Sequence, residues 1–266
     1  MHASVLQRVP WQGEGGRRGG ATATDDNAVQ GAWWGARSVL SLGPRRLYPR
    51  GVPLAASCPR CTSPVSGAGA TFACSLHGSI EPLWRPDEAD YDTFAELVAR
   101  SGDRPTYLPW PMSPGWSIAD FGCVGHDRVR ATVTTTVGNS DLDGHVEVTI
   151  VSEDPGTGLG ARCAGTPYDD PGPQISSGPS AIRVRAGGRT VPMWLVDDLA
   201  DASAATEEDP LARAVFAGEA DGRWLWLVMK PASAALLLQD DWLLADVTGF
   251  GPEALEMPFG GPRPAW

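Results

Sequence analysis

Cys58, Cys61, Cys74 and His77 are the residues of this chain whose types and spacing most clearly permit chemistry. They form a Cys-Pro-Arg-Cys pair and a Cys-Ser-Leu-His pair, with twelve residues between the two pairs. Two such pairs can place three thiolates and one imidazole nitrogen around a single Zn²⁺ ion in a tetrahedron. Because four protein ligands leave no position for water, the spacing predicts a structural zinc site rather than a catalytic one.

The alternative for these cysteines is a pair of disulfides or plain buried thiols. Residues 1–50 contain no apolar run of signal-peptide length, so we expect a cytoplasmic protein, and disulfides are rare in that reducing compartment. Residues 58–84 offer few core side chains, and zinc contributes about 10–16 kcal/mol to the folding of small zinc modules. We therefore favour zinc. The other cysteines, Cys123 and Cys163, have mixed apolar neighbours, and we expect inert core thiols there.

Composition narrows the class of protein. The chain has 266 residues, of which 42% are hydrophobic, and a net charge of −11, which suits one sizeable domain with a small satellite. No stretch approaches eighteen consecutive apolar residues, so we expect no membrane span. An acidic chain with a pI of about 4.7 repels a phosphate backbone, which makes nucleic acid an unfavourable partner.

Four regions follow from the composition along the chain. Residues 1–57 are rich in arginine and glycine and show no periodicity, which predicts a disordered leader; the alternative is a basic arm for nucleic acid or anionic lipid. Residues 58–85 are the predicted zinc ribbon, residues 86–250 a tryptophan-rich α+β domain, and residues 251–266 a Pro/Gly-rich tail.

The expected fold class is α+β, with a small zinc ribbon followed by a mainly antiparallel sheet and two or three helices. Helices are expected near 88–101 and 157–164. Alternating patterns predict strands, and the run 224–229, which is apolar on both faces, should be a central strand. The other predicted strands cover 129–134, 145–150, 182–185, 190–196 and 215–218, with a final hairpin from 236–238 and 242–247.

The segment from Leu108 to Trp116 interleaves prolines with aromatic residues. Such a segment can dock a peptide, but we favour a rigid connector that lays two indoles over the core.

Several motifs together resemble an actinobacterial family of small cytosolic proteins that has no assigned function. They are the two metal-ligand pairs, Leu108-Pro-Trp-Pro with Pro114-Gly-Trp116, Gly158-Leu-Gly-Ala-Arg-Cys-Ala-Gly165, Asp170-Pro-Gly-Pro173, Pro192-Met-Trp194, and Ala214–Glu219 followed by Trp224-Leu-Trp226. The resemblance covers residues 58 to about 247 and implies a zinc ribbon joined to a tryptophan-rich α+β domain. It implies no catalytic residue.

The glycine loop at 156–161 is the main candidate for another activity. Its sequence, Gly-Thr-Gly-Leu-Gly-Ala, fits a dinucleotide-binding pattern in which backbone N–H groups approach phosphate at a helix N-terminus. No acidic residue ends a strand about twenty positions later, and the flanking strands look antiparallel. We therefore favour a tight strand-to-helix turn, with no cofactor bound.

The remaining polar residues suggest no reaction. His126-Asp127 and His145 have no recognisable nucleophile beside them, and Lys230 is expected to be solvated at a strand end. The acid pairs are expected in turns, where carboxylates cap backbone groups. These pairs are Asp169-Asp170, Asp197-Asp198 and Asp240-Asp241.

Three functions from different classes remain. The favoured one is a non-catalytic zinc-ribbon protein that acts as an interaction or regulatory module with a protein partner, in an oligomeric state that the sequence leaves open. The alternatives are a transferase that binds phosphate or nucleotide at 156–161, and a nucleic-acid binder that uses the ribbon. The catalytic residues of an enzyme cannot be assigned, so we expect that the chain is not one.

Overall fold

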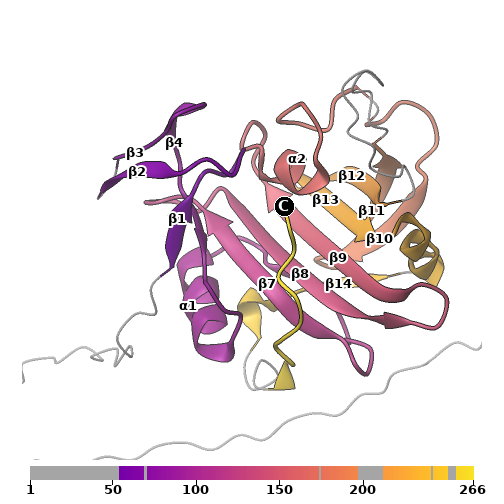
Figure 1. The fold of residues 1–266 in the computed structure, drawn as a ribbon. Coiled ribbons are helices and arrows are strands. Elements are labelled where there is room, and N and C mark those ends of the chain that lie inside the picture. The colour runs from indigo at the N-terminus through magenta and orange to yellow at the C-terminus, as the bar shows by residue number, and fades with distance from the viewer. Residues whose placement is uncertain (1–53, 69–70, 174, 197–211, 241, 251–255) are drawn as a thin grey trace, which may run out of the picture. The chain divides into compact units, whose positions relative to one another are not determined.

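The computed structural model describes residues 54–68, 71–173, 175–196, 212–240, 242–250 and 256–266, and its strands form two sheets (Figure 1). The predicted leader lies almost wholly outside these residues. In spatial order, the large sheet contains β1 (Ala55–Ser57), β5 (Leu83–Arg85), β7 (Ser117–Val124), β8 (Ala131–Ser140), β9 (Gly144–Glu153), β13 (Arg223–Lys230), β12 (Ala214–Ala220), β11 (Arg189–Leu195), β10 (Ile182–Ala186), β14 (Leu243–Asp246) and β6 (Tyr107–Pro109). The small sheet contains β2 (Val65–Ala68), β3 (Thr71–Cys74) and β4 (Gly78–Ile80). The helices are α1 (Tyr91–Ser101) and α2 (Leu159–Ala164), with the 3₁₀ helices η1 (Ala232–Asp240) and η2 (Val247–Gly249).

Strand β13 lies inside the large sheet, between β9 and β12, as its apolar sequence predicts. Leu225, Leu227 and Met229 face one core cluster, on the side covered by η1. Trp226 and Val228 face a second cluster, which includes the apolar residues of α2. Because both faces are covered, the strand carries no polar alternation over its buried residues.

Helix α1 is confirmed close to its expected position but begins at Tyr91, because Asp90 caps it. The main-chain N–H of Thr93 donates to Oδ1 of Asp90 at 2.8 Å, and the N–H of Asp90 donates to Oγ1 of Thr93 at 3.2 Å. This reciprocal capping box satisfies two backbone donors at the helix start. Phe94 and Leu97 of α1 pack with β7 in a third core cluster.

The prediction of a final hairpin from 236–238 and 242–247 is wrong. The leucine-rich run 236–238 belongs to the 3₁₀ helix η1, in which Leu238 is buried and Leu236 is exposed. Three adjacent leucines have no period of two, so they do not distinguish a strand from a helical turn. Strand β14 pairs in parallel with β10 and antiparallel with β6.

Strand β7, the eight-residue strand between β5 and β8, is not among the predicted strands. All its residues after Ser117 are buried, so no alternation of apolar and polar residues identifies it.

Residues 256–266, expected as part of a Pro/Gly-rich tail, pack against β7 and β5. Gly260 donates its N–H to the carbonyl of Ile118, and Arg85 donates to the carbonyl of Pro264. The guanidinium of Arg85 also lies 3.8 Å from the ring centroid of Trp266.

Among the helices that the structure describes, none has the length and apolar character needed to cross a membrane.

Candidate metal centre

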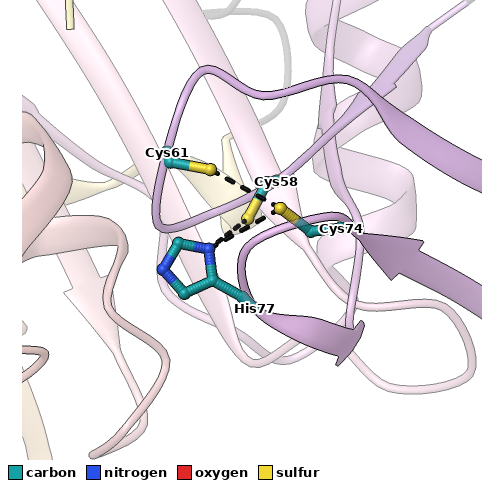
Figure 2. A group of neighbouring side chains, drawn as sticks. All are labelled: Cys58, Cys61, Cys74 and His77. Atoms are coloured by element: carbon teal, nitrogen blue, oxygen red, sulfur yellow. Dashed lines mark hydrogen bonds between the residues drawn. The ribbon is translucent and has the colours of Figure 1, made fainter.

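The four predicted metal ligands come from the loop that precedes the small sheet and from the β3–β4 hairpin within it. Cys58 and Cys61 lie in the loop between β1 and β2, while Cys74 ends β3 and His77 lies in the turn before β4. Figure 2 shows their side chains converging, with Nδ1 of His77 turned toward the sulfur atoms of Cys58 and Cys74. The pairing of β3 with β4 places Cys74 opposite Gly78, which positions the second pair of ligands.

The distances between these donor atoms suit one metal ion. Nδ1 of His77 lies 3.6 Å from the sulfur of Cys58 and 3.6 Å from the sulfur of Cys74. The sulfur atoms of Cys61 and Cys74 are also 3.6 Å apart, and all four donor atoms lie within 4.8 Å of one another. A tetrahedral ion with sulfur ligands at about 2.3 Å and a nitrogen ligand at about 2.0 Å requires edges of about 3.5–3.8 Å. The four residues therefore could hold a metal ion.

The two buried thiols differ in acidity. The main-chain N–H of Leu76 is the largest influence on Cys74 and lowers its pKa from 9.0 to about 6. Burial raises the pKa of Cys58 to about 11, although the N–H of Arg60 partly offsets this by donating to its sulfur at 3.4 Å. Since the thiolate is the form that binds metal, Cys74 offers a ready ligand at neutral pH.

Two arginines attach the metal loops, the segments that carry Cys58, Cys61, Cys74 and His77, to the rest of the fold, and neither contact was expected from the sequence. Arg60 donates to the carbonyls of Gly156 at 2.6 Å and Thr157 at 3.3 Å. Its guanidinium also pairs with Asp169 at 3.2 Å. Arg162 of α2 donates from Nη1 to the main-chain carbonyl of Cys58. The position of Arg60 between two ligands was the one signal in the sequence for these contacts.

The glycine loop at 156–161 is a tight strand-to-helix turn, as favoured from the sequence. Gly158 caps α2 with a left-handed backbone, φ +82°, which glycine adopts without a steric penalty. The N–H of Leu159 donates to Oε2 of Glu153 at 2.8 Å, and the N–H of Gly156 donates to Oδ1 of Asp170 at 2.8 Å. Carboxylates of the chain itself therefore occupy donors that a phosphate would need.

Glu153 is a buried residue that the sequence analysis did not single out. Oε1 accepts a hydrogen bond from Nε1 of Trp226 at 2.7 Å. Burial raises the pKa of Glu153 from 4.5 to about 8, while hydrogen bonds from Gly160, Leu159 and Trp226 act in the opposite direction. Glu153 is the last residue of strand β9, and no local sequence pattern indicates that it is buried or bonded to Trp226.

The structure does not bring the other candidate residues together with the metal ligands. Nε2 of His126 lies 3.8 Å from Oδ1 of the adjacent Asp127, and His145 is exposed in β9. Lys230 was expected to be solvated, but it forms an ion pair with Glu147 at 3.3 Å, because the two face each other across β13 and β9. The pair Asp197-Asp198 and Asp241 lie outside the described residues.

Both remaining cysteines are buried core thiols, as predicted. Cys123 packs in the cluster with α1 and Cys163 in the cluster with α2. Burial raises the pKa of both thiols, that of Cys123 to about 12. Neither belongs to the Cys/His cluster.

The sequence profile of one protein family, described as a family of unknown function (DUF6758), matches residues 53–266. The chain belongs to the DUF6758 family. The matched DUF6758 region includes all four predicted metal ligands, and it extends beyond residue 247 through Trp266, further than the resemblance noted from the sequence. Neither the curated proteins nor the solved structures contain a match to the chain.

Proposed function

We propose that this DUF6758 protein is a zinc-ribbon protein that acts as a non-catalytic interaction or regulatory module. Its four ligands would bind one structural Zn²⁺ ion. The observation that carries the proposal is the convergence of three thiols and one imidazole nitrogen, whose donor atoms all lie within 4.8 Å of one another, with three of the distances at 3.6 Å. Sulfur and nitrogen donors in this number favour zinc over calcium or magnesium, which prefer oxygen. With all four positions filled by protein, the ion would stabilise structure and bind no substrate.

The metal would order a surface turn that is suited to contact a protein. Leu76 lies in the turn between Cys74 and His77, and its side chain is 71% exposed. A metal bound to Cys74 and His77 would hold this turn in one conformation, which lowers the entropic cost of binding a partner protein. We propose a protein partner at this turn, in the cytoplasm, where the cysteines stay reduced.

The two alternatives are less well supported. A phosphate-binding transferase would need free N–H groups at 156–161, but Glu153 and Asp170 accept from two of them. A nucleic-acid binder would need to overcome the net charge of −11 of the chain.

The proposal is tested by comparing complexes that are cross-linked and enriched from the source cells. We expect the wild-type chain to recover one protein at about one copy per chain, as a specific interface requires. Cys58→Ser and Leu76→Asp should both lose this protein. Leu142→Asp is the matched control, because Leu142 is also an exposed leucine in a turn, at 83%. Equal recovery of the partner protein with the wild-type chain and all three variants would contradict the proposal. Turnover of a nucleotide substrate by the wild-type chain would also contradict it.

A further inference from the structure

A pocket of about 430 Å³ lies away from the metal ligands, between parts of the chain that are distant in sequence. The Pro109–Trp116 segment forms one side, the end of β8 forms another, and Leu237 of η1 with the start of β14 completes it. This volume falls within the range of about 300–1,000 Å³ that is typical of small-molecule sites.

Aromatic side chains form much of the pocket wall. Trp110, Trp116 and Trp242 line it, and each indole is only partly buried. The rings of Trp116 and Trp242 lie 6.5 Å apart between centroids, at 78° to each other, so together they form a corner. Gly138 allows this arrangement, because a Cβ at that position would clash with the indole of Trp116.

The charge of the pocket favours a cation. Asp141 is the one charged residue among the described residues that line it. Asp141 is exposed, and within the described part of the chain no hydrogen bond or ion pair engages its carboxylate. An ammonium group is attracted both to a carboxylate and to the face of an indole, and alkylated ammonium groups are the cations that aromatic cages select.

A buried hydroxyl among the residues that line the pocket lacks a partner in the described structure. Along one face of β8, Thr132 donates to the carbonyl of Pro105 and Thr134 to that of Tyr107, both at 2.6 Å. Thr136 is the next residue on this face and lines the pocket, but its fully buried Oγ1 has no partner in the described structure. A buried polar atom of this kind is destabilising unless a ligand or water satisfies it.

We propose that this pocket binds a small alkylated ammonium compound that carries a neighbouring hydroxyl group. Trp116 and Trp242 contact the alkylated ammonium group, Asp141 balances its charge, and Thr136 hydrogen-bonds its hydroxyl. A carboxylate in place of the hydroxyl is disfavoured, because Asp141 repels it. This site needs no metal, so it is independent of the function proposed above.

The test uses choline as the probe and wild-type protein, with isothermal titration calorimetry as the measurement. We expect saturable binding, at least about tenfold tighter than that of 3,3-dimethylbutan-1-ol, which has the same shape without the charge. Tetramethylammonium, a trimethyllysine peptide and glycine betaine should all bind more weakly than choline. Equal affinity for the neutral alcohol, or no saturable binding of choline, overturns the proposal. Tighter binding of the trimethyllysine peptide assigns the site to a modified protein and overturns the choice of a small hydroxylated ligand.

Three variants locate the site. Asp141→Asn should weaken choline binding about tenfold, whereas Asp127→Asn, an exposed carboxylate elsewhere, should leave it unchanged. Thr136→Val should weaken binding of choline but not of tetramethylammonium, which has no hydroxyl. Full affinity for choline in either Asp141→Asn or Thr136→Val overturns the role assigned to that residue. Unchanged melting temperatures show that the variants are folded.

Discussion

Nε1 of Trp226 lies 2.7 Å from Oε1 of Glu153, and both side chains are fully buried. The other carboxylate oxygen of Glu153 accepts from the N–H of Leu159 at the start of α2. One glutamate thus joins the central strand β13 to the N-terminal end of the helix that carries Arg162, the residue bonded to the Cys58 carbonyl. The buried carboxylate and the metal loops are therefore connected through a single short helix.

The stability of the protein should depend on pH through Glu153. Its pKa is about 8 in the folded protein and has an ordinary value of 4.5, so the native state holds one more proton than the unfolded chain between these values. Linkage then makes the free energy of unfolding fall as the pH rises through this window, on the order of 1 kcal/mol per pH unit. The contribution of Glu153 to stability is therefore greatest below pH 4.5 and is lost progressively as the pH rises to about 8.

Urea unfolding at about pH 5.5 and about pH 7.5 measures this dependence. Glu153→Gln removes the titrating group and should flatten the difference between the two conditions, whereas Glu256→Gln, at an exposed position, should retain it. A wild-type protein that is equally stable at both pH values would show that Glu153 stays ionised throughout.

Gly160→Ala should destabilise the protein, although alanine is the better helix former. A Cβ at Gly160 would clash with ring atoms Cδ1 and Nε1 of Trp226, so the helix or the indole must move. We expect a loss of about 1–3 kcal/mol in the free energy of unfolding, the usual cost of overpacking a core. Gly249→Ala is the control, since a Cβ there meets no atom within 4 Å, and it should change stability by less than about 0.5 kcal/mol. A more stable Gly160→Ala protein would contradict the packing described here.

Purified protein prepared without chelators should contain about one zinc ion per chain, as measured by elemental analysis. Cys58→Ser removes one ligand and should lose the metal while the large sheet stays folded, as judged by circular dichroism. Cys123→Ala changes a buried thiol outside the cluster and should keep the zinc. A wild-type zinc content below about a tenth of an equivalent would refute the zinc assignment.

Arg162→Met should weaken zinc binding without abolishing it. The guanidinium holds the main-chain carbonyl of Cys58, so its loss frees the loop that carries the first two ligands. Residues that orient metal ligands typically contribute about 10–100-fold to affinity, and we expect an effect near the lower end. Competition with a fluorescent chelator measures it, and Arg183→Met, on an exposed residue of β10, serves as the control. Equal zinc affinity of the two variants would show that the contact with Cys58 is incidental.

The sequence by itself determined the features that depend on short-range spacing. The intervals between the cysteines and the histidine predicted four residues that lie close together and could hold a metal ion. Each pair is separated by only two residues, so a single turn brings its two side chains together. The apolar run 224–229 identified a strand covered on both faces, and the acidic start of 88–101 identified a helix. Each of these patterns involves residues that are close together in the chain, so it can be recognised from the sequence alone.

Only the tertiary structure decided which distant residues meet. Glu153 and Trp226 are far apart in the chain and pair because β9 and β13 are neighbours. Strand β14 joins β10 in parallel, and the pocket collects Trp116, Thr136 and Trp242 from three segments. Strand order and side-chain packing depend on how the whole core is filled, and no local periodicity records that choice.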